Sequence, residues 1–443
     1  MHRLANHFKN QNILIYGFGK SGRACFDYLR KKNQIKIYDD EFLNISRQLK
    51  KYLISKSKLI KINFDYIVIS PGIDINSCTL KKFLKKNKNK IISELDIFYF
   101  DNLDNKKLTI TGTNGKSTTS KLLYEILIKN NYDARLVGNI GNPLLLEKNI
   151  KPKTIFVIEA SSYQIEYSKY FKTDLAVILN ISPNHLERHK TIKNYVRSKF
   201  KLIKSQNKNG LAFIEKDNQY LEKELKTNRI KSKAIKVSGD LLSDIKNKIK
   251  NPYFENIDNK KNLKFVLDIS KKLKLNSKKV LQSINSFKGL KFRQQIIYKN
   301  KRLLIINNSK STNFSSSINL LKSYKNIYWL VGGKFKRGDR FRLNRKFHKN
   351  IHAYIVGKYA KFFVQEMRNK VKYNIFKNTK KALEKIVHDT KKNNLYPANI
   401  IFSPAAASFD QFNNFEERGK NFNYLVGKLK IINKINARYK SYI

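Results

Sequence analysis

The residues with the clearest chemical potential lie in segment 111–118, which reads Thr-Gly-Thr-Asn-Gly-Lys-Ser-Thr. The segment follows a short β-branched run and precedes a helical pattern with apolar residues on one side. In such a loop Gly115 lets backbone amides approach phosphates, Lys116 neutralises phosphate charge, and the Ser117 hydroxyl can bind Mg²⁺. The strict pattern has a glycine five residues before Gly115, where this chain has Ile110, so the loop is a shortened variant. We predict a nucleoside triphosphate site here.

A second glycine-rich loop occupies segment 17–22, which reads Gly-Phe-Gly-Lys-Ser-Gly. Its G-x-G-x-x-G spacing lets backbone amides and a helix N-terminus approach a diphosphate. Asp39 and Asp40 end the next predicted strand, where a carboxylate can contact a ribose or a base. A dehydrogenase would use such a loop, but nothing downstream supplies hydride chemistry. A nucleotide-sugar diphosphate would use the same contacts, and a tight turn without a ligand is the remaining alternative.

Two further groups follow predicted strands in the same αβ unit as segment 111–118. Glu159 ends a buried run, and a carboxylate there can reach a metal beside the phosphate-binding loop. His185 follows the next predicted strand at the same sheet edge. A lone carboxylate or histidine is more often structural, and we assign His189 and His352 to that class. The neighbouring phosphate-binding loop favours a functional role for Glu159 and His185.

These motifs need parallel strands to position them, and the sequence supplies three successive α/β patterns. Short β-branched runs alternate with helical patterns, and the third stretch has strand patterns at 303–306, 328–331, 353–356 and 400–402. No pattern is clear between 201 and 262. We predict an α/β protein with three domains: 1–98, 99–288 and 289–443.

The charge balance is strongly basic, because 92 Lys and Arg against 33 Asp and Glu give +59 at pH 7. Such charge is typical of nucleic-acid-binding proteins. Here the basic residues are spread along all 443 positions, and Asn, Ile, Phe and Tyr, which share AT-rich codons, are abundant. We therefore interpret the charge as compositional drift and predict no specific nucleic-acid partner, with nucleic-acid binding as the alternative.

Several protein classes are excluded by composition. Hydrophobic residues make up 41% of the chain, enough for packed cores and too many for wholesale disorder. No apolar run approaches the roughly 18 residues of a membrane span, and residues 1–20 show no signal-peptide pattern. Cys25 and Cys78 are the only cysteines, which argues against a disulfide scaffold. We expect a cytoplasmic protein without a membrane span.

Taken together, the motifs resemble the Mur ligase family, which builds the peptidoglycan stem peptide. The matching segments are 17–22, 70–72, 111–118, 138–141, 159–166, 180–189, 307–313 and 403–422. The last two are most similar to the member that adds D-glutamate to UDP-N-acetylmuramoyl-L-alanine, whose length also fits. The resemblance implies an ATP-dependent acid–amino-acid ligase that acts in the cytoplasm, with a monomer favoured. The alternatives are a ligase for another amino acid, including folate polyglutamylation, and a basic nucleic-acid-binding protein that kept the fold.

The resemblance also implies one role for each domain: a Rossmann-like UDP-binding domain, a P-loop ATPase-like domain and a Rossmann-like amino-acid-binding domain. The UDP-sugar would be bound by Lys20, Ser21, Asp39, Asp40, Gly72, Asn139, Ser161, Gln164 and His185. ATP would be bound by Gly112, Thr113, Asn114, Gly115, Lys116, Ser117, Thr118, Asn259, Arg293 and Asn308. D-Glutamate would be bound by Lys310, Thr312, Lys336, Ser408 and Phe415.

The implied catalytic residues are Lys116, Glu159, His185 and Lys199, and the implied ligands of two Mg²⁺ ions are Ser117, Glu159, His185 and Lys199. Lys199 matches the family's carbamylated lysine. A free ammonium beside Mg²⁺ would have a lowered pKa, and the neutral amine could take up CO₂. The resulting carbamate is an anionic oxygen ligand of the kind that Mg²⁺ prefers.

Three positions in the implied ATP pocket depart from the family pattern. Asn308 stands where the family has Asp, Phe292 where it has His, and Asp258 where its His-Asn-x-x-Asn motif begins with His. Asn259 and Arg293 remain available for the nucleotide. An asparagine at 308 can still accept a hydrogen bond from a ribose hydroxyl. We therefore expect an altered pocket rather than an inactive one.

Overall fold

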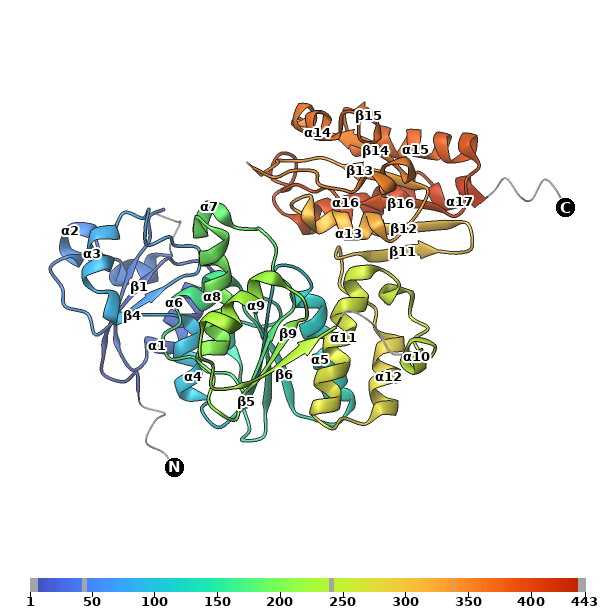
Figure 1. Ribbon diagram of the computed structural model, residues 1–443. Coiled ribbons are helices and arrows are strands. Elements are labelled where there is room, and N and C mark those ends of the chain that lie inside the picture. Colours follow the sequence, from blue (N-terminus) through green and yellow to red (C-terminus); the bar gives the residue numbers. More distant parts are fainter. Residues whose placement is uncertain (1–6, 42–45, 239–242, 337, 437–443) are drawn as a thin grey trace. The chain divides into compact units, whose positions relative to one another are not determined.

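The computed structural model describes residues 7–41, 46–238, 243–336 and 338–436 (Figure 1). The chain divides into two compact units, which are described separately below. The first unit is Met1–Gly239 with Lys264–Ser283, and the second is Asp240–Leu263 with Ile284–Ile443. Three sheets with parallel strands confirm the predicted α/β class. The domain boundaries near 98 and 288 stay predictions.

The N-terminal sheet of the first unit carries the loop 17–22. Its four parallel strands have the order β2-β1-β3-β4. The strands are β1 (Asn12–Tyr16), β2 (Gln34–Tyr38), β3 (Tyr66–Ile69) and β4 (Ile91–Ile92). The helices of this part are α1 (Lys20–Leu29), α2 (Lys56–Leu59), α3 (Lys81–Lys86) and α4 (Glu94–Asp101). Because β1 is central and leads directly into α1, the loop lies at the carboxyl edge of the sheet, where ligands bind in such folds.

The second sheet of the same unit carries the loop 111–118. Its six parallel strands have the order β10-β9-β8-β5-β7-β6. The strands are β5 (Lys106–Thr111), β6 (Ala134–Gly138), β7 (Ile155–Glu159), β8 (Leu175–Ile178), β9 (Leu211–Glu215) and β10 (Lys233–Val237). The helices that follow these strands are α5 (Lys116–Lys129), α6 (Ser162–Tyr167), α7 (Leu186–His189), α8 (Ile192–Lys204) and α9 (Gln219–Thr227). Strand β5 lies between β7 and β8, so the segments after all three strands meet at one edge.

Three helices connect this sheet to the rest of the chain: α10 (Ser243–Lys246), α11 (Ile257–Lys272) and α12 (Ser277–Ser286). The apolar residues Phe265 and Ile269 of α11 pack into the core beneath the second sheet. The region 201–262, where the sequence showed no clear pattern, contains β9, β10 and several helices.

The second unit is built on a six-stranded sheet of order β11-β12-β16-β13-β14-β15, in which only β11 is antiparallel to its neighbour. The strands are β11 (Gln295–Lys299), β12 (Leu303–Asn307), β13 (Ile327–Val331), β14 (Ile351–Val356), β15 (Lys372–Phe376) and β16 (Ala398–Phe402). The helices are α13 (Ser315–Lys322), α14 (Ala360–Met367), α15 (Thr379–Asn393), α16 (Phe415–Lys428) and α17 (Ile431–Asn436). The four strands predicted in this region are confirmed.

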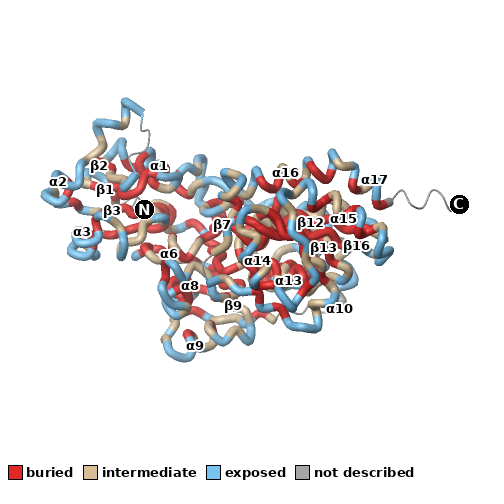
Figure 2. The backbone as a smooth tube through the Cα atoms, turned by 90° about the horizontal axis from the view of Figure 1, so that it is seen from above, coloured by how far each residue is buried: buried red, intermediate tan, exposed pale blue. Residues whose placement is uncertain are grey.

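Burial follows the strands in both units. Buried residues (red in Figure 2) concentrate on the sheets, while helices alternate buried and exposed positions. In the second unit, separate apolar clusters cover the two faces of the sheet, one around Trp329 and the other around Tyr354. This double coverage is typical of parallel sheets. None of the described helices is long and apolar enough to cross a membrane.

Candidate active site

The loop between β5 and α5 has the geometry of a phosphate-binding loop. Gly115 precedes α5 with φ +84°, a conformation that favours glycine. The Nζ atom of Lys116 donates to the carbonyl oxygens of Gly112 and Thr113, both at 2.9 Å. The Lys116 side chain therefore folds back over the loop. Its ammonium group lies near the N-terminus of the 14-residue helix α5, where the helix dipole is positive.

Hydrogen bonds from the segment that follows β8 hold the phosphate-binding loop in place. The Asn180 side chain accepts a hydrogen bond from the Asn114 amide at 2.8 Å and donates to the Asn114 carbonyl at 3.1 Å. The Thr113 amide donates to the Asn180 carbonyl at 2.9 Å, and the Thr113 hydroxyl lies 3.1 Å from the Tyr195 hydroxyl. Asn180 and Tyr195 thus fix the loop, a role that the sequence did not reveal for either residue.

Two buried oxygen atoms beside the loop fit a divalent cation. Ser117 and Glu159 are each 1% exposed, and Ser117 Oγ and Glu159 Oε2 have no hydrogen-bond partner in the described part of the chain. The other carboxylate oxygen of Glu159 accepts a hydrogen bond from Asn139 Nδ2 at 2.8 Å. Anionic and hydroxyl oxygens are the ligands that Mg²⁺ prefers. Within the described ranges no three His, Cys, Asp or Glu side chains form a metal cluster, so Mg²⁺ here would need further oxygen ligands.

Lys199 is a buried amine directly behind the loop. The side chain comes from α8, is 1% exposed, and donates from Nζ to the Gly112 carbonyl at 3.0 Å and the Thr111 hydroxyl at 3.2 Å. Burial, reinforced by the charge of Lys116, holds the pKa of Lys199 well below its usual range, and Glu159 opposes this only in part. Burial therefore favours the neutral form of this amine more than at an exposed lysine.

The two histidines at α7 have different surroundings. His185, with φ +56°, directly precedes the helix, and its Nδ1 lies 2.7 Å from the Tyr163 hydroxyl. His189 is buried with Nε2 3.0 Å from the Ser162 hydroxyl. Burial, together with the charge of Arg188, lowers the pKa of His189 to about 4. His189 is therefore neutral near pH 7, whereas His185 is half-buried at the same sheet edge as the phosphate-binding loop.

The loop 17–22 combines close packing with open space. A Cβ atom on Gly22 would lie 1.9 Å from the Gly17 carbonyl oxygen, so only glycine fits where α1 packs against the loop. At Gly19, no heavy atom of the described chain other than those of Gly19 and its two neighbours in sequence lies within 4 Å of the position a Cβ would take. Lys20 is exposed and Ser21 half-buried at the start of α1. This arrangement matches what a diphosphate at a helix N-terminus requires.

The predicted uridine residues Asp39 and Asp40 also have structural partners. Asp39 accepts a hydrogen bond from the Phe18 amide at 2.5 Å and so fixes the glycine loop. Asp40 accepts from the Tyr16 hydroxyl at 2.6 Å and from the Thr79 hydroxyl. Asp39 therefore holds the loop itself, whereas Asp40 contacts Tyr16, the residue that directly precedes the loop.

The other predicted UDP-sugar residues lie on loops of the first unit. Ser161 and Gln164 form a capping box at the start of α6, with the Ser161 amide donating to Gln164 Oε1 at 3.0 Å. Gly72 is exposed, and its carbonyl accepts from Arg188 at 3.4 Å. Arg188 also contacts Glu166 at 3.1 Å, so it connects the loop after β3 to α6. No sequence signal distinguishes Arg188 from the many other basic residues.

In the second unit the predicted D-glutamate residues gather at one sheet edge. They follow three adjacent strands: Lys310 and Thr312 come after β12, Lys336 after β13, and Ser408 after β16. Phe415 begins α16, and Lys310 Nζ lies 3.8 Å from the centre of its ring. The edge therefore presents ammonium groups, hydroxyl groups and an aromatic ring together.

The predicted ATP residues of this unit are held by local contacts. Asn308 donates to the Ser403 hydroxyl at 3.0 Å and accepts from the Gln294 amide at 3.2 Å. Asn259 is buried and donates to the Tyr253 carbonyl at 2.9 Å. The carbonyl of the half-buried Arg293 accepts from the Tyr253 hydroxyl at 3.2 Å.

The other two departures from the family pattern also have defined surroundings. The Phe292 ring packs on α16, where a Cβ atom on Gly419 would lie 2.3 Å from it. Asp258 accepts from Asn319 at 2.7 Å. Each changed residue is thus accommodated by contacts within the second unit.

Two positioning residues of the second unit escaped the sequence analysis. Arg418 is 5% exposed and donates to the Ser309 hydroxyl at 3.1 Å and the Ala406 carbonyl at 2.9 Å, linking the loops after β12 and β16. Asp339 accepts from the Phe314 amide at 2.8 Å and links the loop after β13 to the start of α13. Both act through contacts between distant segments, which leave no local sequence pattern.

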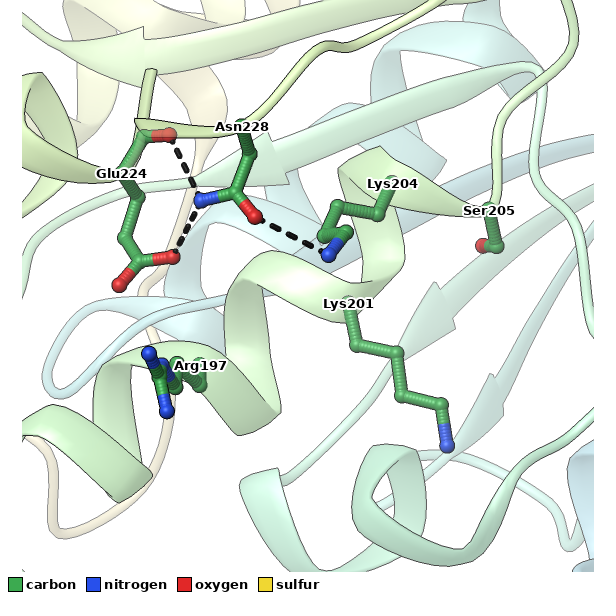
Figure 3. A pocket seen from close by; sticks show the side chains of 6 residues that line it. All are labelled: Arg197, Lys201, Lys204, Ser205, Glu224 and Asn228. Atoms are coloured by element: carbon green, nitrogen blue, oxygen red, sulfur yellow. Dashed lines mark hydrogen bonds between the residues drawn. The ribbon is translucent and has the colours of Figure 1, made fainter. Parts of the chain in front are cut away.

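An open pocket of about 510 Å³ lies elsewhere on α8 (Figure 3). Arg197, Lys201 and Lys204 line it from the side of the helix opposite Lys199, as their spacing requires. Lys201 donates to the Glu166 carbonyl at 3.1 Å and Lys204 to Asn228 at 3.0 Å. None of the predicted site residues lines this pocket.

Comparison with known proteins identifies relatives of nearly full length. Residues 110–321 match the Mur ligase middle domain. A UDP-N-acetylmuramoylalanine–D-glutamate ligase of Rickettsia bellii is 34% identical over 96% of this chain and 99% of the relative, and that of Rickettsia felis is 33% identical over 94% and 97%. Among solved structures, a MurF ligase from Thermotoga maritima in complex with ADP has a TM-score of 0.56, at 14% identity over 96% of this chain and 97% of that one. The last similarity concerns the fold alone.

Proposed function

This chain belongs to the Mur ligase family, and on that basis we propose that it adds D-glutamate to UDP-N-acetylmuramoyl-L-alanine at the expense of ATP. The observation that carries the proposal is the pairing, within one unit, of the phosphate-binding loop 111–118 with the open glycine loop 17–22. One loop suits a triphosphate and the other a diphosphate. The names of the Rickettsia relatives, which cover nearly the whole chain, support D-glutamate as the amino acid.

The reaction proceeds through an acyl phosphate. A carboxylate is a poor electrophile, so an alanyl carboxylate oxygen first attacks the γ-phosphorus of ATP, and ADP leaves. The amine of D-glutamate then attacks the acyl carbon, loses a proton and displaces phosphate, which carries away the original carboxylate oxygen. Lys116 neutralises charge on the transferred phosphoryl group, and the loop amides hold the phosphates in line.

Mg²⁺ fits the donor set beside the loop. Ser117 and Glu159 would hold one ion through the two partnerless oxygens. Bound there, the ion supplies charge neutralisation and orientation of the phosphate oxygens. Asn139 orients the Glu159 carboxylate by its 2.8 Å hydrogen bond.

Lys199 is carbamylated in the active enzyme. Its neutral, buried amine adds to the carbon of CO₂, a C–N bond forms, and the nitrogen loses a proton to give an anionic carbamate. With His185 and Glu159 the carbamate would hold a second Mg²⁺. The 3.0 Å contact between the Lys199 amine and the Gly112 carbonyl supports this proposal, because the amine lies against the phosphate-binding loop.

D-Glutamate is bound by the second unit. Its two carboxylates suit Lys310, Lys336 and the hydroxyl groups of Thr312 and Ser408, because charge-assisted hydrogen bonds are strong. The reaction belongs to peptidoglycan precursor synthesis, and we place it in the cytoplasm.

The test is a phosphate-release assay with ATP, Mg²⁺, UDP-N-acetylmuramoyl-L-alanine and a panel of amino acids. Release should require the UDP-sugar and be fastest with D-glutamate. Faster release with L-amino acids or meso-diaminopimelate would assign the chain to another ligase of the family. Salt-sensitive nucleic-acid binding without ATP turnover would instead indicate a non-catalytic protein that kept the fold.

A further inference from the structure

A buried arginine outside the phosphate-binding loop joins the two sheets of the first unit. Arg188 lies on α7 and is 9% exposed. It forms ion pairs with two carboxylates from separate elements. The Nη2 atom lies 3.1 Å from Glu166 of α6, and the Nε atom lies 3.7 Å from Asp74 in the loop after β3. The guanidinium group therefore holds a loop of the N-terminal sheet against a helix of the second sheet.

Arg188 and Tyr167 together hold the loop after β3 by its backbone. The Nη1 atom of Arg188 donates to the Gly72 carbonyl at 3.4 Å, and its Nη2 atom donates to the Tyr167 hydroxyl. That hydroxyl in turn donates to the Ile73 carbonyl at 2.8 Å and accepts from the Ile75 amide at 3.3 Å. The position of the loop, which carries the expected UDP-sugar residue Gly72, thus depends on one guanidinium group and its tyrosine partner.

Arg188 also contacts the surroundings of His185, which is expected to bind both the UDP-sugar and a metal ion. The Arg188 amide donates to the His185 carbonyl at 3.2 Å. The guanidinium carbon lies 5.1 Å from the centre of the Tyr163 ring, a distance at which a cation is attracted to an aromatic face. The hydroxyl of Tyr163 lies 2.7 Å from His185 Nδ1. Arg188 therefore contacts both the backbone and the side-chain partner of His185.

Stability alone does not account for this network. Taking a guanidinium group out of water is costly, and its ion pairs usually do no more than offset that cost. The Nε atom of Arg188 is buried and has no hydrogen-bond partner in the described ranges, which adds to the cost. The best-attested use of a buried ionic group is to fix the register of the elements that it joins. Here those elements are the loop after β3, α6 and α7.

We propose that Arg188 is a positioning residue, which sets the loop that receives the UDP-sugar in register with His185 and so aligns the alanyl carboxylate for phosphoryl transfer. This inference rests on the proposed function, because that function places the UDP-sugar at Gly72 and His185. The hydrogen bonds that fix the phosphate-binding loop come instead from Asn180 and Tyr195. Binding of ATP should therefore not depend on Arg188.

The test is steady-state phosphate release by the full chain, with the UDP-sugar and ATP varied in turn at saturating D-glutamate. Arg188→Ala should raise the KM for the UDP-sugar and lower kcat, while the KM for ATP keeps its wild-type value. The kcat/KM for the UDP-sugar should fall roughly a hundredfold, the effect of misplacing reacting groups by about 1 Å. Added methylguanidine should restore part of the rate. Arg188→Lys should be intermediate, because lysine keeps the charge but lacks the planar set of donors.

Arg197→Ala is the matched control, because Arg197 is an exposed arginine on the next helix, α8, and lines the pocket of Figure 3. Both of its KM values should equal those of the wild type. Asp74→Asn tests the inference if Arg188→Ala does not fold. This variant removes the charge that pairs with Arg188 on the loop after β3, so it should raise the KM for the UDP-sugar and not the KM for ATP.

A wild-type KM for the UDP-sugar in Arg188→Ala would overturn the inference, and so would an equal rise in both KM values. A residue that only stabilises the fold would lower the amount of active enzyme without affecting one substrate selectively. If Arg188→Ala is unfolded, a wild-type KM for the UDP-sugar in Asp74→Asn would overturn the inference. Absence of UDP-sugar-dependent phosphate release in the wild type would instead contradict the proposed function.

Discussion

Single side chains around the phosphate-binding loop lie in surroundings that change their chemistry. Lys199 is buried next to a second ammonium group, and Glu159 keeps one buried oxygen without a partner. Structural stability alone does not favour either arrangement, since unpaired buried groups destabilise a fold. A bound cation would pair with the Glu159 oxygen, and an anion or CO₂ would make the burial of the Lys199 amine favourable. The surroundings of Lys199 and Glu159 therefore support the proposed chemistry at the carboxyl edge of the second sheet.

Replacing Lys116 by Ala should remove charge stabilisation that acts mainly in the transition state. By analogy with other preorganised donors, we expect kcat to fall by a factor equivalent to about 3–4 kcal/mol. Lys121→Ala is the matched control, because Lys121 lies on the same helix and pairs with Glu125 at the surface. Steady-state phosphate release measures both. Near-normal turnover of Lys116→Ala would remove this residue from the mechanism.

Lys199→Ala should nearly abolish activity because it removes the carbamate. Added acetate or formate should restore part of the rate, since a small carboxylate can occupy the vacated space and supply the same oxygen ligand. Lys201→Ala, a neighbour on the opposite side of α8, should need no rescue. Full activity of Lys199→Ala without any additive would refute carbamylation.

Among the secondary-structure elements, the loops that follow adjacent parallel strands contain the predicted binding residues. The glycines of these loops determine how closely a ligand can approach the backbone. The motifs 17–22 and 111–118 could be predicted because each is continuous in sequence and its spacing alone dictates the geometry. Asn180 and Arg418 could not be predicted, because their roles arise where distant segments meet. Strand β10 was missed because most of its residues are not buried, so it lacks the apolar pattern of a core strand.

Two glycines of the first loop should respond differently to alanine. Gly22→Ala should destabilise the fold, because the new Cβ would lie 1.9 Å from the Gly17 carbonyl oxygen. Gly19→Ala meets open space and should melt like the wild type, but it should weaken UDP-sugar binding by obstructing the diphosphate. Thermal melting and calorimetric titration separate the two effects. Wild-type affinity in Gly19→Ala would place the diphosphate elsewhere.

The loops after β12 and β16 should determine selectivity for the amino acid. Lys310→Ala and Ser408→Ala should raise the KM for D-glutamate far more than the KM for ATP, because they remove charge and a hydroxyl from the carboxylate site. Lys325→Ala, an exposed lysine before β13, serves as the control. Steady-state kinetics with each substrate varied in turn make the comparison. Equal effects on both KM values would mean that the amino acid binds elsewhere.

At the scale of the whole molecule, the sequence predicted the class of fold and the strands of the second unit, because buried parallel strands leave strong apolar runs. The departures at Asp258, Phe292 and Asn308 are now seen as part of a consistent set of contacts within that unit. The two phosphate-recognising loops share the first unit, and the predicted amino-acid residues belong to the second. Under the proposed function, the first unit activates the carboxylate and the second recognises the incoming amine.

The central claim is that a carboxylate of the UDP-sugar is activated by phosphoryl transfer, and oxygen labelling tests it most directly. UDP-N-acetylmuramoyl-L-alanine labelled with ¹⁸O in its carboxylate is incubated with ATP, Mg²⁺ and D-glutamate, and the phosphate is analysed by mass spectrometry. The account predicts that each phosphate released carries one labelled oxygen and that the new amide keeps the other. Unlabelled phosphate would show that the γ-phosphoryl group goes to water, which would contradict the acyl-phosphate mechanism.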